Sequence, residues 1–142
     1  MDLNRFLDKR DEMRLTGDFD SYGSVKDPEK GNELIVGARV YRMVYKEMGY
    51  SLNEDAPDLL HACVIAMFEL VYDMPVIKTV LVDPQAIIRE VCGDEEPDRD
   101  AVRYANMAVC TLNEVFKGIM AQPERLDEFK DPSRGEKKNS VQ

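Results

Sequence analysis

The sequence predicts an all-α protein, a compact single-domain bundle of five to seven helices. In most long segments apolar residues recur at intervals of three and four, which is the period of an amphipathic helix. Asp27, Asp55 and Asp83 each precede such a segment, where an aspartate can cap a helix. A chain of 142 residues is also long enough to bury one core. We therefore expect one helical domain over residues 1–131.

The first third of the chain predicts two helices and a loop. Residues 2–15 place apolar side chains on one side of a helix. Residues 16–27 hold glycines among aspartates and serines, which indicates a loop. A second helix is expected from Pro28 to Met48, with Asp27 as its cap and Gly49 after its end. Its apolar row has helical spacing: Leu34, Ala38, Tyr41, Tyr45 and Met48.

The stretch PDLLHACVIAMFELVYD, residues 57–73, predicts a third helix, with Asp55 as its cap and Pro75 after its end. Residues 75–82, PVIKTVLV, are ambiguous because their β-branched side chains favour a strand. The same residues also fit one face of two helical turns. A lone strand would have no partner in an all-α chain, so we expect a helix there.

The last third of the chain predicts two more helices. Asp83, Pro84 and Gly93 mark the ends of a short one. A long helix is expected over about residues 97–121, with Asp94 or Glu96 near its cap. Residues 132–142 are polar and offer little apolar area to bury, so we expect a disordered tail.

Several features of the sequence favour a cytoplasmic protein. The charged N-terminus lacks the apolar core of a signal peptide, and no apolar run reaches the length of about 20 residues that spans a bilayer. Three widely spaced cysteines argue against a disulfide framework or a zinc site. We therefore expect no membrane partner.

The acidic charge indicates what kind of partner the protein binds. The net charge is −9, and the excess comes from residues 51–75 and 94–100. Because such a chain repels phosphates, direct nucleic-acid binding is disfavoured. We expect the acidic residues to guide a protein partner that has a basic surface. The proposed contact residues are Glu54, Asp55, Asp58, Asp94, Glu95, Glu96, Asp98 and Asp100.

One basic stripe gives an alternative contact surface. Arg39, Arg42 and Lys46 would share a face of the expected second helix and could bind an anion or an acidic partner. The preferred explanation is a solvated face that neutralises Glu47 and the acids at residues 54–58. Isolated surface ion pairs contribute only about 0–1 kcal/mol, so the stripe says little about stability.

The chain carries no recognisable catalytic motif. It lacks a phosphate-binding loop, a nucleophile elbow and a second histidine, so we predict no catalytic residue and no cofactor. His61 falls outside the apolar stripe of its helix, one turn after Asp58, and is interpreted as a boundary residue. The alternative is a small all-α metal-dependent hydrolase. Its ligands would come from two acid pairs and the histidine: Glu29, Glu33, His61, Glu69 and Asp73.

The leading hypothesis is a non-enzymatic protein that binds a macromolecule, as an adaptor, an antitoxin or immunity-type protein, or an inhibitor of host defence. A third hypothesis is a structural homo-oligomer, of which a homodimer is the simplest form. It would be built through small residues that let helices approach closely: Gly37, Ala38, Ala101, Ala105 and Ala108. Eight methionines favour an irregular core, although methionine also lines adaptable binding surfaces.

Overall fold

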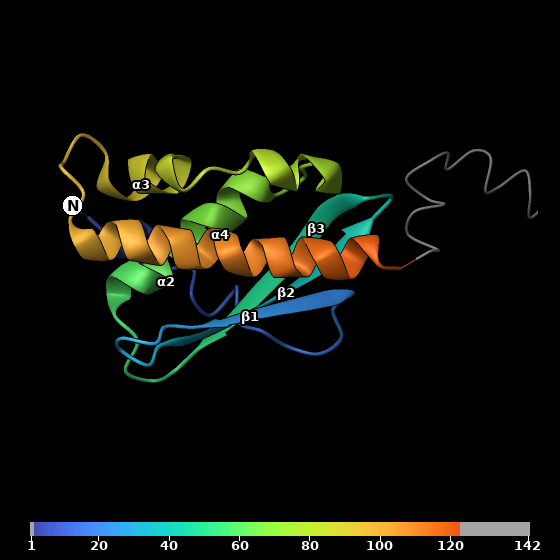
Figure 1. Cartoon of the computed structure of the whole chain (residues 1–142), viewed down its shortest axis with the longest axis horizontal. Coiled ribbons are helices and arrows are strands. Elements are labelled where there is room, and N and C mark those ends of the chain that lie inside the picture. Colours follow the sequence, from blue (N-terminus) through green and yellow to red (C-terminus); the bar gives the residue numbers. More distant parts are fainter. Residues whose placement is uncertain (1, 123–142) are drawn as a thin grey trace, which may run out of the picture.

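The protein is an α+β domain and not an all-α bundle. The computed structural model describes residues 2–122, which form a three-stranded antiparallel sheet in the order β1-β2-β3 with helices packed on one face (Figure 1). The prediction of five to seven helices without a sheet was therefore wrong. The elements in chain order are α1 (Asn4–Leu7), β1 (Ser21–Lys26), β2 (Glu33–Tyr41), β3 (Val44–Leu52), α2 (Asp58–Val71), the 3-10 helix η1 (Val76–Leu81), α3 (Pro84–Cys92) and α4 (Arg99–Met120).

The expected second helix is the β2–β3 hairpin. In β2, alternate residues from Leu34 to Val40 are buried and face the helices, while Arg39 and Tyr41 are exposed. Side chains four residues apart share a face in a strand as well as in a helix. The steps of four in the apolar row of this segment therefore fitted both periods, whereas its steps of three fitted only a helix. The alternation and the β-branched residues of β2 were the signals that favoured a strand.

A tight turn of unusual composition joins β2 to β3. Arg42 and Met43 have φ values of +52° and +59°, a left-handed conformation that glycine and asparagine adopt most readily. Burial of Met43 and a 2.8 Å hydrogen bond from the Val76 backbone N–H to its carbonyl hold the turn in place. Its position therefore depends on η1.

Asp27 ends a strand and does not cap a helix. The segment expected to be a loop, residues 16–27, contains β1, and Asp27 begins the connection to β2. Its carboxylate accepts a 2.9 Å hydrogen bond from the Glu29 backbone N–H, and its own N–H donates to the Asn32 carbonyl at 2.7 Å. Aspartate stabilises a turn by the same kind of hydrogen bond with which it caps a helix. An aspartate at this position is therefore compatible with a turn as well as with a helix cap.

Helix α2 is the central element of the fold. It packs against β3, α1, α3 and α4, and nine of its 14 residues are buried. Sequence predicted this helix correctly. Its cap was predicted wrongly, because Pro57 occupies that position and no side chain caps the helix.

The elements of the last third follow the predicted pattern closely. Asp83 caps α3 by accepting a 2.9 Å hydrogen bond from the Gln85 N–H, and Gly93 ends the helix with a positive φ. Residues 76–81 are a 3-10 helix, so the preference for a helix over a strand was right. Helix α4 begins later than expected, because Asp98 and not Asp94 or Glu96 is its cap.

Helix α4 and strand β1 approach each other very closely. A Cβ atom at Gly23 would lie 2.5 Å from the Thr111 backbone oxygen. Ser21 Oγ donates a 2.8 Å hydrogen bond to the Val115 carbonyl. On the opposite face of the sheet, Phe19 packs so tightly on Gly37 that a Cβ there would lie 2.8 Å from its ring.

Two expectations concern the ends of the chain and the membrane. The predicted disordered tail, residues 132–142, falls outside the described residues. Across residues 2–122, none of the helices combines the length and the apolar character that crossing a bilayer requires.

The α4–β1 contact generates a prediction about stability. Gly23→Ala should lower the free energy of unfolding by about 1–3 kcal/mol, because the new methyl group would press on the backbone of α4. Gly17→Ala is the matched control, since nothing lies within 4 Å of a Cβ there. The control should change stability by less than about 1 kcal/mol. Urea unfolding of both variants checks this, and equal stabilities would contradict the packing of α4 on β1.

Candidate functional site: an apolar groove at the edge of β3

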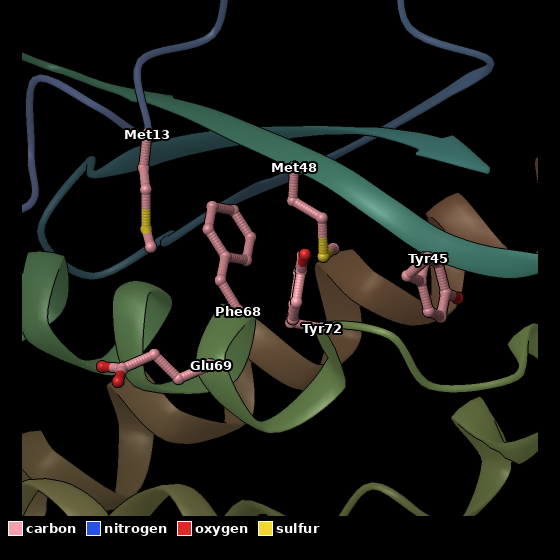
Figure 2. Close-up of a pocket in the computed structure, with 6 residues that line it drawn as sticks. All are labelled: Met13, Tyr45, Met48, Phe68, Glu69 and Tyr72. Atoms are coloured by element: carbon pink, nitrogen blue, oxygen red, sulfur yellow. The ribbon is translucent and has the colours of Figure 1, made fainter. Parts of the chain in front are cut away.

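A surface groove lies between strand β3 and helix α2. Its volume is about 310 Å³, and its lining comes from three segments of the chain: Met13, Tyr45, Met48, Phe68, Glu69 and Tyr72. Met13, Met48, Phe68 and Tyr72 point toward one another, whereas the Glu69 carboxylate lies to one side (Figure 2). Phe68 is buried, both methionines are half-buried and Tyr72 is exposed. The groove therefore has an aromatic floor, flexible walls and an aromatic rim.

The groove lies where the outer edge of β3 has no neighbouring strand within residues 2–122. At one end of the edge, the Tyr45 N–H donates to the Met74 carbonyl at 3.0 Å, and the Tyr45 carbonyl accepts from the Asp73 N–H at 2.9 Å. At the other end, the Tyr50 N–H donates to the Met13 carbonyl at 2.9 Å, and the Tyr50 carbonyl accepts from the Leu15 N–H at 2.8 Å. These two hydrogen-bonded ends are the closures of the edge, and Met48 lies between them.

A bulge in the β2–β3 ladder places two groove residues on the same face. Tyr45 and Met48 are three residues apart, so regular alternation would turn them to opposite faces of the sheet. The register shifts between Arg39 and Val40, which pair with Glu47 and Tyr45 and leave Lys46 as the extra residue of β3. Both Tyr45 and Met48 therefore face the helices.

The hydroxyl of Tyr45 is already satisfied within the protein. The Thr79 hydroxyl donates to the Val76 carbonyl at 2.6 Å, so it accepts from the Tyr45 hydroxyl, also at 2.6 Å. Burial raises the pKa of Tyr45 to about 12, although the hydrogen bond to Thr79 lowers it in part. Tyr45 thus remains a neutral phenol that anchors η1 to the sheet and contributes an apolar ring to the groove.

The charges around the groove are matched in pairs. Lys9 Nζ lies 3.1 Å from Glu69 Oε2, and Lys46 forms an ion pair with Asp73. The groove therefore offers a binding segment apolar and aromatic surface, with little unbalanced charge beside it.

His61 and Tyr50 extend the aromatic row beyond the groove. The Tyr50 hydroxyl and His61 Nδ1 are hydrogen-bonded at 2.7 Å, and the Tyr50 ring meets the Phe68 ring edge-on with centroids 5.9 Å apart. Burial raises the pKa of Tyr50 to about 12. Burial and the nearby Arg10 lower the pKa of His61, against the opposing effect of Asp58. The expected boundary histidine thus bonds to β3.

The acidic residues before and within the first turn of α2 partly engage local partners. Glu54 is exposed, Asp55 Oδ1 accepts a 2.6 Å hydrogen bond from Asn53 Nδ2, and Asp58 Oδ1 lies 3.9 Å from Arg10 Nη1. These residues lie at the end of the molecule where α4 also begins (Figure 1). Two acidic segments separated in the sequence thus belong to the same end of the fold.

The acidic residues before α4 fall into two kinds. Asp98 accepts a 2.8 Å hydrogen bond from the Ala101 N–H as the helix cap, and Asp100 Oδ1 lies 2.6 Å from Arg103 Nη2. The remaining three occupy exposed positions in the connection from α3: Asp94, Glu95 and Glu96.

The basic stripe does not lie on a helix face. Arg39 Nε lies 3.3 Å from Glu47 Oε2 across the two strands, and Lys46 pairs with Asp73. Arg42 sits in the hairpin turn with its guanidinium 5.4 Å from the Tyr41 ring centroid. The three bases therefore belong to separate local contacts.

The five residues of the alternative metal set also lie in separate contacts. Glu29 pairs with Arg103, and His61 bonds to Tyr50, while Glu69 and Asp73 pair with lysines. Glu33 is exposed at the start of β2. Within residues 2–122, no three His, Cys, Asp or Glu side chains lie close enough to hold a metal ion.

The small-residue faces considered for self-association are used within the chain. Ala38 lies on the buried face of β2, and the alanines of α4 are buried in the same core: Ala101, Ala105 and Ala108. A Cβ at Gly37 would meet Phe19 and Leu15. These faces pack against the protein's own sheet, helices and N-terminal segment.

The sequence contained the groove residues but not their arrangement. Met48 and Tyr45 appeared as members of a helical apolar row. The open edge of β3 depends on which segments cover it, and no local pattern records that. The excess of methionine was the one signal that fitted an adaptable surface.

Comparisons with known proteins give no family for this chain. No family model matches it, and no curated protein does. Among solved structures, the N-terminal part of a nitrogen-fixing NifU-like protein from Brucella abortus is similar, with a TM-score of 0.48, 14% identity, and coverage of 91% of this chain and 92% of that chain. A protein described as hypothetical aligns with a TM-score of 0.47, 13% identity, and coverage of 89% and 95%. At these scores neither likeness carries an inference about function.

His61 generates a prediction about pH dependence. Its folded pKa is lower than the ordinary 6.5, so the unfolded chain takes up the proton first as the pH falls. The stability that this group contributes should therefore be present above pH 6.5 and decline just below it. Urea unfolding at about pH 7.5 and about pH 5.5 should show a larger loss for the wild type than for His61→Asn. Equal losses would contradict the burial of the imidazole beside Arg10.

Proposed function

We propose that this protein is a non-enzymatic binding module that takes a segment of a partner polypeptide into the groove between β3 and α2. The observation that carries the proposal is the groove itself, with Tyr72 66% exposed at its rim. An exposed aromatic side chain beside an apolar hollow is typical of the anchor points at which proteins bind each other.

The lining of the groove supports a polypeptide ligand. Met13 and Met48 have flexible, polarizable side chains that adapt to different apolar shapes. A volume of about 310 Å³ is at the lower end of the range for small-molecule sites, and it suits one large apolar side chain. Because the neighbouring charges are already paired, a neutral apolar side chain is the occupant that leaves no charge unmatched.

The acidic charge has a separate part in this proposal. The net charge of −9 would attract a partner with a basic surface from a distance, chiefly through the exposed acids Glu54, Asp94 and Glu96. Such attraction acts mainly on the association rate and weakens with salt. Contact in the groove would then determine how long the complex lasts.

A peptide selection with a rim variant tests the proposal. A displayed library of random peptides should yield ligands for the wild type whose affinity falls about tenfold or more in Tyr72→Asp, because the new charge would be buried against an apolar ligand. Leu81→Asp is the matched control, since Leu81 is 73% exposed on η1 and does not line the groove. Its affinity should stay within about twofold. No enriched peptide, or equal loss in both variants, would contradict the proposal.

A further inference from the structure

The backbone of β3 presents hydrogen-bonding groups at the groove. In an antiparallel sheet, residues two apart direct their N–H and C=O to the same side of the strand. Tyr50 directs both groups outward, where they bond to Met13 and Leu15. Met48 therefore also directs both groups outward. Among residues 2–122, no backbone hydrogen bond outside the sheet reaches Met48.

We infer that the partner segment binds in an extended conformation, as a short strand added to the edge of β3 at Met48. This inference rests on the proposed function and names the form of its ligand. An extended backbone supplies one acceptor and one donor to the Met48 N–H and C=O. A helical segment would not, because its backbone groups bond to one another within the helix.

The two closures of the edge limit the length of the added strand. Tyr45 is bonded to residues 73–74 and Tyr50 to residues 13–15, so the uncovered stretch lies between them. Strands rise about 3.3 Å per residue, which leaves room for a core of about three residues. The ligand is therefore a short extended stretch and not a long strand or a whole sheet.

The same geometry specifies the central residue of the ligand. Met48 faces the helices, so a residue paired with it across the new ladder directs its side chain to that face also, into the groove. The ion pairs Lys9–Glu69 and Lys46–Asp73 flank this place and are matched within the protein. Charge complementarity therefore calls for an uncharged centre, a large apolar side chain.

Hydrogen exchange of the full-length chain tests the backbone contact. A peptide selected on the wild type should slow exchange of the Met48 amide by about tenfold or more at saturation. The Tyr50 amide is the internal control, because it already donates to the Met13 carbonyl at 2.9 Å and should change little. Two-dimensional NMR of the labelled protein follows both amides in one sample.

Backbone methylation of the same peptide gives a second readout. N-methylation at alternate positions should weaken binding by about tenfold where the N–H points to Met48, and by less than about twofold where it points to solvent. This alternation supports the added strand, whichever way it runs.

Each remaining outcome overturns the inference in a recognisable way. A peptide that loses affinity in Tyr72→Asp but leaves Met48 exchange unchanged overturns the added strand and keeps the proposed function. Protection of Met48 that grows with protein concentration in the absence of peptide assigns the edge to a second copy of this chain. A selection that yields no peptide overturns both proposals together.

Discussion

The structure depends on the enclosure of helix α2. Residues from Ala62 to Phe68 are buried without interruption, so this helix is apolar on almost every side. A surface helix has one apolar stripe and needs one packing partner, whereas a helix of this composition needs partners all round. The sheet covers α2 on one side, α3 and α4 cover it on others, and the N-terminal segment with Phe6 completes the enclosure.

Enclosure ends near the C-terminal end of α2, and the groove lies there. Glu69 and Tyr72 reach the surface beside β3, where no backbone hydrogen bond from another segment of residues 2–122 reaches Met48. Exposed strand edges are usually blocked, because they can pair with other chains. Here hydrogen bonds close the edge at Tyr45 and Tyr50 and leave Met48 between them without one among residues 2–122, so the proposed added strand would be short.

The N-terminal segment connects the stability of the fold to the groove. It packs Phe6 into the core, pairs with Tyr50 and supplies Met13 to the wall of the groove. The ion pairs that join it to the helices, Lys9–Glu69 among them, are partly exposed and contribute little individually. Burial of the phenyl ring and the backbone hydrogen bonds to Tyr50 therefore hold the segment in place, and the salt bridges add orientation.

The acidic charge acts over a longer distance than contacts within the groove. Several acids singled out from the sequence bond locally in the fold, as Asp98 does in capping α4 and Asp55 in accepting from Asn53. Local hydrogen bonds leave their charge in place, so the field of the molecule remains strongly negative. In the proposed function, long-range attraction and short-range fit would therefore belong to different parts of the surface.

The sequence by itself determined the elements with strong local signals. Asp83 and Gly93 mark the ends of α3, and the apolar run Ala62–Phe68, with Pro57 before it and Pro75 after it, defines α2, because caps and periodicity are local properties. Only the tertiary structure decided that residues 33–52 form a hairpin, since part of their apolar spacing also fits a helix and a strand is stable only beside its partners. It also decided the groove, because the accessibility of Met48 depends on segments distant in the chain that stop on either side of it.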